Sequence, residues 1–235
     1  MQTLKRSKDR KVANSVTKSG NPNIANSFGL PSGKQYSCQD QTEFCEVICY
    51  AGKLEKIYKG VKTNLLHNWD LVKDATRDDM ITLLDDMVSE FVAECEKRDA
   101  DKLFRIHWDG DFFNNDYTRA WSDIVKRFPD VQFWVYTRSL PSALTLHMAK
   151  HDNLALYFSA DRDNMPMARV AEAKGINIAY VGTDFAEGKE LFPKATKCPE
   201  NNKAIPLISE KGSACKVCGL CIKGRKSVLF STSKK

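Results

Sequence analysis

The nine residues Leu103-Phe104-Arg105-Ile106-His107-Trp108-Asp109-Gly110-Asp111 join an apolar run to a polar turn. Residues 103–107 have the short apolar pattern of a buried strand. The turn then places two carboxylates around Gly110. Because turns use short polar residues for backbone reasons, Asp109 and Asp111 suit a structural role as well as a binding role. The stretch therefore predicts a strand that ends in candidate functional residues.

The same unit of strand and polar turn recurs along the chain, with helices between the copies. Further strands are predicted at 131–136, 154–158 and 176–181, and helices at 117–128, 141–150 and 166–174. Strands separated by helices of this length need crossover connections, which produce a parallel sheet. An earlier strand at 23–30 makes five, and residues 204–208 are a candidate sixth that Pro206 restricts to an edge. Two helices, 51–74 and 78–92, lie between the first strand and residue 103.

Polar residues also follow the later strands, as Thr137-Arg138-Ser139, Ser159-Ala160-Asp161 and Gly182-Thr183-Asp184. Functional sites in parallel α/β folds form at the carboxyl ends of the strands. Arg138 suits a carboxylate or phosphate, and Ser159 and Asp161 suit ribose hydroxyls. His107, at another strand end, suits either proton transfer or a structural hydrogen bond. We expect these strand ends to surround one pocket.

The loop after the first predicted strand carries Cys38, Cys45 and Cys49, with six residues between the first two and three between the last two. A structural zinc site takes four protein ligands, whereas three thiolates leave one coordination position open for a cofactor or substrate. A set of unrelated core and surface thiols is the alternative. The number of thiols therefore predicts a [4Fe-4S] cluster with one free iron at this loop.

A second group of four cysteines lies near the end of the chain, at Cys198, Cys215, Cys218 and Cys221. Zinc ribbons use two separated pairs, whereas overlapping C-x-x-C steps with a distant Cys-Pro are closer to a ferredoxin-type run. The surrounding segment has little apolar periodicity, so a metal would organise it. We expect a second [4Fe-4S] cluster here, with zinc and a metal-free segment as alternatives.

Composition limits the classes of protein that this chain can represent. Hydrophobic residues make up 42% and charged residues 28%, which excludes extensive disorder. No apolar run approaches the roughly 20 residues that span a membrane, and no apolar signal region begins the chain, so we expect no membrane partner and a cytoplasmic location. Thiols stay reduced there, which favours metal binding over disulfides for the clustered cysteines, while Cys95 is expected in the core. Phosphate-binding loops, nucleophile elbows and metalloprotease histidine pairs are absent from the sequence.

Three cysteines after the first strand of a six-stranded partial barrel are the arrangement of radical S-adenosylmethionine enzymes, which this chain resembles. The turn at Gly110 looks like the glycine-rich turn that contacts the amino group of S-adenosylmethionine in that superfamily. More closely, the chain after residue 23 resembles a family of small, cysteine-rich proteins of tailed phages. The motifs that carry this second resemblance are residues 27–33, Cys49-Tyr50-Ala51, residues 107–112, Tyr136-Thr137-Arg138-Ser139 and Cys218-Gly219-Leu220-Cys221.

The resemblance implies a partial (β/α)6 barrel with parallel strands and a small cysteine-rich C-terminal metal module. It implies S-adenosylmethionine and an electron donor as partners, and an unidentified substrate for which nucleotide-related compounds are candidates. The expected catalytic residues are Asp109, Asp111 and Arg138, and the expected cofactor-binding residues are Gly110, Tyr50, His107, Ser159 and Asp161. The superfamily spaces its cysteines by three and two residues and puts an aromatic residue before the last one, whereas here Tyr50 follows it. A chain that keeps a cluster without radical chemistry is therefore an alternative.

The chain divides by composition into three parts. Residues 1–22 are expected to form a flexible basic arm, residues 23–193 the barrel with its cysteine loop, and residues 194–235 the metal module. The formal net charge is +6, with basic residues at both ends. A non-enzymatic, metal-stabilised protein that binds nucleic acid or serves a redox role is thus a rival interpretation. If the gene is carried by a phage, the cytoplasm is that of the infected bacterium.

Overall fold

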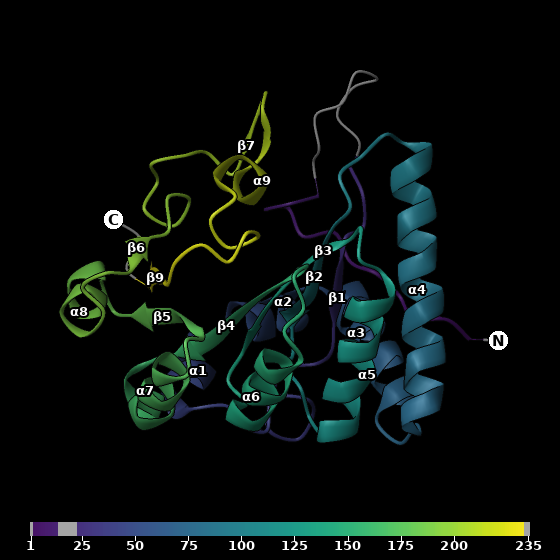
Figure 1. Cartoon of the computed structure of the whole chain (residues 1–235), viewed down its shortest axis with the longest axis horizontal. Coiled ribbons are helices and arrows are strands. Elements are labelled where there is room, and N and C mark those ends of the chain that lie inside the picture. Colours follow the sequence, from purple (N-terminus) through teal and green to yellow (C-terminus); the bar gives the residue numbers. More distant parts are fainter. Residues whose placement is uncertain (1, 14–22, 233–235) are drawn as a thin grey trace.

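The computed structural model describes residues 2–13 and 23–232, and within them the chain builds a seven-stranded parallel sheet (Figure 1). The strands lie in the order β1 (Ser27–Gly29), β2 (Leu103–Asp109), β3 (Gln132–Thr137), β4 (Leu154–Ala160), β5 (Asn177–Gly182), β9 (Val228–Ser231) and β6 (Thr196–Lys197). Each neighbouring pair is parallel. The first five strands therefore follow one another across the sheet in chain order.

Five helices cover one face of the sheet (Figure 1). They are α4 (Arg77–Lys97), α5 (Asn115–Arg127), α6 (Leu140–Ala149), α7 (Met165–Ala173) and α8 (Phe185–Leu191). Right-handed crossovers between strands in sequential order place their helices on the same side. Phe104 of β2 lies at the centre of this packing, with its ring centroid 5.0 Å from that of Phe91 and 6.1 Å from that of Trp121. The main hydrophobic core thus fixes β2, the strand that ends at Asp109.

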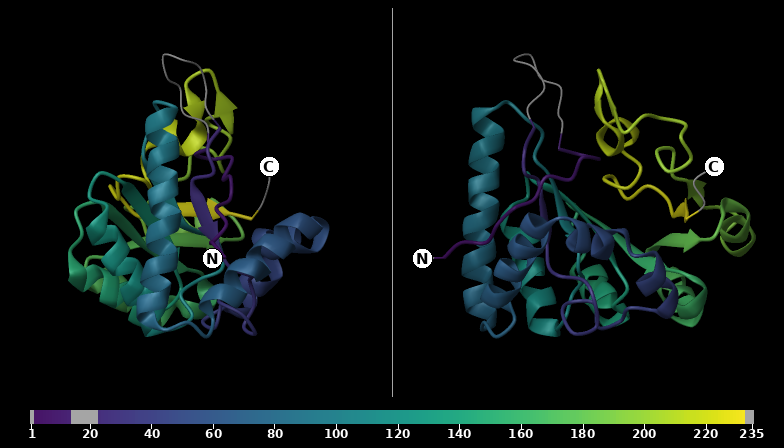
Figure 2. Two further views of the ribbon diagram at one scale, coloured as in Figure 1. Left: turned by 90° about the vertical axis from the view of Figure 1, so that its right-hand side faces the viewer. Right: turned by 180° about the vertical axis from the view of Figure 1, so that it is seen from behind.

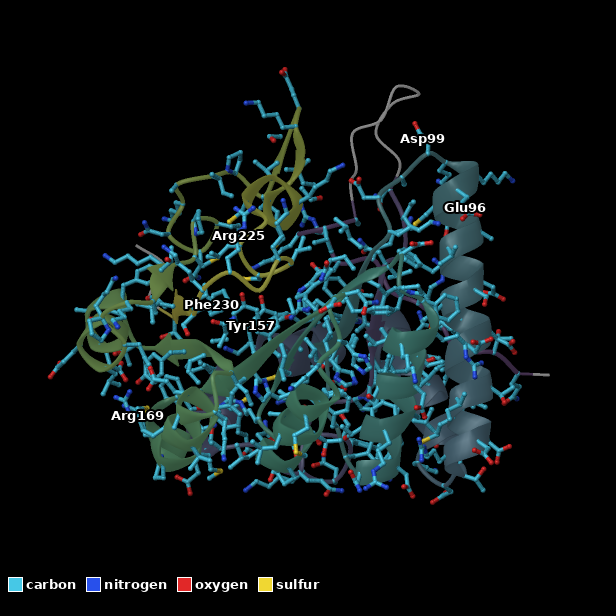
Figure 3. The ribbon with its side chains drawn as sticks, in the orientation of Figure 1. Glu96, Asp99, Tyr157, Arg169, Arg225 and Phe230 are labelled. Atoms are coloured by element: carbon cyan, nitrogen blue, oxygen red, sulfur yellow. The ribbon has the colours of Figure 1, made fainter. Side chains whose placement is uncertain are left out.

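The opposite face of the sheet is covered by the C-terminal segment. This segment contains the hairpin of β7 (Ile208–Ser209) and β8 (Gly212–Ser213) and the short helix α9 (Ala214–Cys218). Tyr157 and Phe230 lie between the sheet and this segment, which also carries Arg225 (Figure 3). A second apolar layer therefore joins this segment to the sheet, with Cys198 and Cys221 buried in it.

Three further helices lead from β1 to α4: α1 (Glu43–Ile48), α2 (Tyr50–Ile57) and α3 (Lys59–Val72) (Figure 2). The sequence predicted one helix over 51–74, but the backbone leaves the helical region at Tyr58, where φ is −112° and ψ is 101°. The helix α1, within the cysteine loop, was not predicted.

The structure confirms an α/β fold built on a parallel sheet, and it differs from the prediction at both ends of the chain. Residues 204–208 do not supply the expected sixth strand at an edge of the main sheet, because Ile208 pairs with Ser213 in the separate β7–β8 hairpin. The sixth strand across the sheet is β9, which pairs with β5, and β6 follows it at the edge. Both strands come from the segment that was expected to form a separate metal module. The main sheet, rather than a metal alone, therefore holds this segment in place.

The start of the chain also packs more closely than expected. Of the proposed flexible arm, residues 14–22 lie outside the described residues, and residues 2–13 lie against the fold. Leu4 and Val12 are buried, and Arg6 pairs with Glu94 over 2.9 Å. Arg6 and Lys11 thus have carboxylate partners distant in the sequence, Glu94 and Glu200, which the composition of the segment could not show.

Candidate functional site

The cysteine loop crosses the carboxyl ends of the central strands. Its position depends on hydrogen bonds to residues just beyond β2 and β4. The bonds run from Thr42 Oγ1 to Asp161 Oδ2 (2.7 Å), from Phe44 N to Asp163 Oδ2 (2.8 Å), from Asp111 N to Ser37 Oγ (3.2 Å) and from Tyr50 Oη to the Trp108 carbonyl (2.8 Å). The expected convergence of the loop and the strand ends is therefore present.

Local sequence explains why the loop presents its thiols in this way. Thr42 caps α1 by accepting a hydrogen bond from Cys45 N at 3.0 Å. Cys49 ends that helix and caps the next, because its Sγ accepts a hydrogen bond from Gly52 N at 3.3 Å. The last two cysteines are thus fixed by the break between two short helices.

The three thiols share their charged neighbours. Burial raises the pKa of Cys38, Cys45 and Cys49 alike. The Asp109 carboxylate raises the pKa of Cys38 and Cys49 further, whereas Arg138 lowers that of Cys45. The thiols therefore surround one region of the strand ends and remain protonated at neutral pH unless a cation lowers their pKa.

Arg138 and Asp161 form a buried ion pair beneath the loop. Arg138 Nη1 lies 2.6 Å from Asp161 Oδ2, and the side chains are 9% and 0% exposed. Asp161 also accepts from Asp163 N at 2.9 Å and so caps the turn after β4. Ser159 contributes its backbone carbonyl, which lies 3.4 Å from Arg138 Nη1. These residues join the ends of β3 and β4 to the cysteine loop.

Asp111 connects β2 to β3. Its Oδ1 accepts from Thr137 Oγ1 at 2.6 Å and from Phe112 N at 2.8 Å, and its Oδ2 accepts from Arg138 N at 2.8 Å. Burial raises the pKa of Asp111 to about 6 in spite of these three hydrogen bonds. Because its oxygens are already occupied, Asp111 positions the neighbouring residues.

Asp109 differs from Asp111 in the partners of its two oxygens. Oδ1 accepts from Gly110 N at 2.9 Å, whereas the buried Oδ2 has no partner of ordinary hydrogen-bond geometry among the described residues and has the Glu55 carboxyl group as its neighbour. Burial and the nearby Glu55 carboxylate raise the pKa of Asp109 to about 8. The carboxyl group therefore keeps its proton at neutral pH and can donate a hydrogen bond to a ligand.

Gly110 allows the cysteine loop to approach the end of β2. Its φ is +83°, and a Cβ at this position would lie 2.6 Å from Ser37 Oγ and 2.8 Å from the Leu30 carbonyl. The close approach requires glycine. The structure thus gives this residue a packing role, and its contact with a cofactor stays a prediction.

His107 lies apart from the other predicted site residues. Its Nε2 is 2.9 Å from the Tyr117 hydroxyl on α5, and its ring packs 4.8 Å from that of Phe112. Burial, followed by the Arg105 charge, lowers the pKa of His107 to about 3. The side chain therefore lies among the helices as a neutral group.

We expect His107 to make stability depend on pH. The unfolded chain has an ordinary histidine pKa of 6.5, so it gains a proton below that pH while the folded chain does not. Stability is therefore lost as the pH falls, and the advantage of wild type over His107→Gln should shrink by about 2 kcal/mol between pH 7 and pH 5. Urea unfolding across this range measures the difference. The exposed His147→Gln control should show a constant difference, and a constant difference for His107→Gln would contradict the prediction.

The four C-terminal cysteines meet on the other face of the sheet. Cys198, Cys215, Cys218 and Cys221 all line one small cavity of about 20 Å³. Backbone hydrogen bonds place them: Cys198 N donates to the Leu229 carbonyl over 2.9 Å, and Cys215 N donates to the Lys11 carbonyl over 2.8 Å. The sheet and the N-terminal residues thus bring the four side chains together.

A polar and aromatic bridge separates the two cysteine groups. Tyr50, next to Cys49, has its hydroxyl 3.5 Å from Arg105 Nη2. The Arg105 guanidinium lies 5.4 Å from the centroid of the Tyr136 ring, and Tyr136 lies beside Cys221. Arg105 is held by Asp9 over 2.6 Å. This bridge depends on Arg105 and Asp9, neither of which the sequence singled out.

Among the described residues, no three or more His, Cys, Asp or Glu side chains are grouped closely enough to hold a single metal ion. The eight cysteines are free thiols. The four C-terminal cysteines share one cavity, and metal binding by either cysteine group stays a prediction.

A cavity of about 390 Å³ opens beside Cys49. One wall is the loop that follows β1, and the other is formed by α2 and α3. Its lining includes Lys34, Lys53, Lys56 and Lys62. The sequence did not predict this cavity, because it depends on how the two helices return past the loop.

Comparison with known proteins assigns the chain to one family, and the family model and the individual relatives agree. The model of a family described as Gene product 88 matches residues 2–224. Proteins named "Gene 88 protein" from Mycobacterium phages L5 and D29 are 61% identical over 239 residues and 60% identical over 240 residues, with 100% of both chains covered in each case. No solved structure matches. The predicted resemblance to phage proteins is confirmed.

Within the described residues, no helix is long and apolar enough to cross a membrane.

Proposed function

The chain belongs to the Gene product 88 family, and we propose that it is an iron-sulfur protein whose loop cysteines bind a [4Fe-4S] cluster with one open iron. The observation that carries this proposal is the position of Cys38, Cys45 and Cys49 over the polar ends of β2 to β4. Three thiolates provide three of the four ligands that such a cluster requires. The strand ends leave polar groups beside the remaining position.

The arrangement of thiols suits a cluster better than a single ion. A single zinc needs its ligands to converge on one point at about 2.3 Å, whereas a [4Fe-4S] cluster binds each thiolate to a different iron. Its ligands can therefore stand farther apart around a shared space. The four C-terminal cysteines line one cavity, although no group among the described residues meets the requirement for one ion.

We propose a radical S-adenosylmethionine type of reaction at the loop cysteines, on a partial barrel. The sequential strand order supports this architecture, because all the crossovers then lie on one side. When bound, the cluster supplies one electron to a cofactor held at its open iron. Asp109 Oδ2 offers a hydrogen-bond donor to that cofactor, and the Arg138–Asp161 pair fixes the loop above the strand ends.

The C-terminal cysteines would bind a second [4Fe-4S] cluster. Their common cavity supports this assignment, and its apolar walls, which include Leu220 and Val228, would exclude water. The bridge through Tyr50, Arg105 and Tyr136 would then connect the two clusters across the sheet. This arrangement favours electron relay as the role of the second cluster.

Metal analysis of anaerobically purified protein tests the proposal. Two clusters predict about eight iron and eight sulfide atoms per chain. After reduction with dithionite in the presence of S-adenosylmethionine, we expect 5'-deoxyadenosine to form. Zinc at the C-terminal cysteines and an empty loop would contradict the iron-sulfur assignment, and iron without 5'-deoxyadenosine would contradict the radical reaction alone.

We expect Cys45→Ala to halve the iron content, to about four atoms per chain, because the loop cluster loses a ligand while the C-terminal cluster keeps all of its own. Iron and sulfide analysis, with electron paramagnetic resonance of the reduced protein, measures the loss. Cys95→Ala is the matched control, since Cys95 is a buried thiol of α4 that belongs to neither cysteine group and contacts the Asp101 carbonyl at 3.7 Å. Full iron content in Cys45→Ala would show that this thiol is not a ligand.

A further inference from the structure

The cavity beside Cys49 has the size and composition of a binding site for an anion. Its volume of about 390 Å³ falls in the range of small-molecule sites in proteins. Four lysines line it against two carboxylates, Glu46 and Glu55. Glu55 is already engaged, since its Oε1 accepts from Ser32 N at 2.9 Å. The lining therefore carries an excess of positive charge.

The lysines of this cavity have no carboxylate partners. Within the described residues, Lys34, Lys53, Lys56 and Lys62 form no ion pair. Four cations around one hollow that holds only two carboxylates repel one another, so an anionic ligand would stabilise them.

A side-chain amide in the same cavity supplies an independent observation. Gln41 is 9% exposed as a whole and lines the cavity, and in the described part of the chain its side-chain amide makes no hydrogen bond to protein. The amide is not among the buried unpaired polar groups, so the part of Gln41 that stays accessible is open to the cavity. Gln41 therefore offers a donor and an acceptor to whatever occupies the cavity.

We propose that this cavity binds a nucleotide. The lysines of α2 and α3 would hold the phosphates, and the amide of Gln41 would pair with the edge of the base, which presents donors and acceptors together. S-adenosylmethionine does not suit these walls, because its sulfonium and ammonium groups would face four lysines. The nucleotide is a different ligand from the cofactor.

Cys49 lines the same cavity and belongs to the cysteine loop. The bound nucleotide would therefore lie beside the loop cluster and act as the substrate, a consequence that rests on the proposed function. Binding itself depends only on the cavity. The nucleotide comes from one of two sources, the free metabolite pool or the end of a nucleic-acid strand.

Calorimetry with the anaerobically purified full chain tests the proposal. The probes are ADP, adenosine, inorganic pyrophosphate and a 5'-phosphorylated single-stranded oligonucleotide. We expect ADP to bind with higher affinity than pyrophosphate or adenosine, because it uses both the lysines and the amide. Tighter binding of ADP than of the oligonucleotide assigns the site to free nucleotides, and the reverse assigns it to a strand end.

Two variants separate the parts of the site. Lys53→Gln with Lys56→Gln removes two charges and should weaken ADP binding about tenfold or more. The control, Lys97→Gln with Lys126→Gln at exposed positions of α4 and α5, should leave the affinity for ADP unchanged. Gln41→Leu should weaken ADP about tenfold and leave pyrophosphate unaffected.

The outcomes distinguish this inference from the proposed function. Failure of ADP and the oligonucleotide to bind overturns the inference, and so does binding that is insensitive to both cavity variants. Equal affinity for ADP and pyrophosphate would show that the base makes no contact with Gln41. Each result is independent of the iron content, which is measured on the same sample and tests only the cluster.

Discussion

The unfolding free energy of Asp161→Asn should fall by about 3 to 5 kcal/mol, because the substitution leaves the buried guanidinium of Arg138 without its counterion. The two side chains are 2.6 Å apart and nearly inaccessible to solvent. The variant also weakens the hydrogen bond from Thr42, which holds the cysteine loop. Since small domains are stable by only about 5 to 15 kcal/mol, the loss should be visible as a large shift in urea unfolding.

Two further variants identify the cause. Asp163→Asn lies two residues away and also contacts the loop, through Phe44 N, but its side chain is 38% exposed, so the cost should be about 1 kcal/mol. Replacing both partners, as Asp161→Asn with Arg138→Met, removes the unpaired charge and should recover part of the loss. A double variant that is as unstable as the sum of the single ones would disprove a charge-pair origin.

The sheet was largely predictable because its strands are local apolar runs bounded by polar turns. The predicted strand at 154–158 agrees with β4 (Leu154–Ala160), for example. The last central strand was missed, because β9 (Val228–Ser231) is only four residues long and lies in a basic tail. Its place beside β5 is decided by packing of the C-terminal segment on the sheet, and short-range pattern does not encode such pairing.

The candidate site was predictable where it depends on strand ends. Parallel strands bring their carboxyl ends together, so the meeting of Asp111, Arg138 and Asp161 followed from the fold class. The position of His107 did not follow, because the pairing shifts between Ser27 opposite Arg105 and Gly29 opposite Asp109. This bulge interrupts the alternation of side chains and turns His107 toward α5.

The lysine-lined cavity shows a different limit. In the sequence, Lys53 and Lys56 look like the solvated face of a helix. Each side chain is exposed, so taken one at a time they give no sign of a binding site. Their significance comes from the loop opposite them, which brings Gln41 and Lys34 to the same hollow. Such a site depends on the angle at which α2 and α3 return past β1, and a change in that angle would separate its two walls.

Gly110→Ala should destabilise the protein by about 3 kcal/mol or more and should empty the loop of iron. Part of the cost arises from φ of +83°, which disfavours residues with a Cβ by about 1 to 2 kcal/mol. The larger part is steric, since the new Cβ would meet the Leu30 carbonyl at 2.8 Å and the Ser37 hydroxyl at 2.6 Å. Relief requires the loop to move away from β2, and Cys38 would move with Ser37.

Gly175→Ala separates these two causes, because Gly175 has nearly the same φ, +85°, but no atom within 4 Å of the added Cβ. It should cost only the conformational penalty, about 1 kcal/mol, and keep all its iron. Urea unfolding gives the two free energies, and iron analysis shows whether the loop cluster alone is lost. If Gly110→Ala and Gly175→Ala lose the same unfolding free energy, the loop tolerates displacement. Some feature other than the close packing at Gly110 would then hold the three thiols over the strand ends.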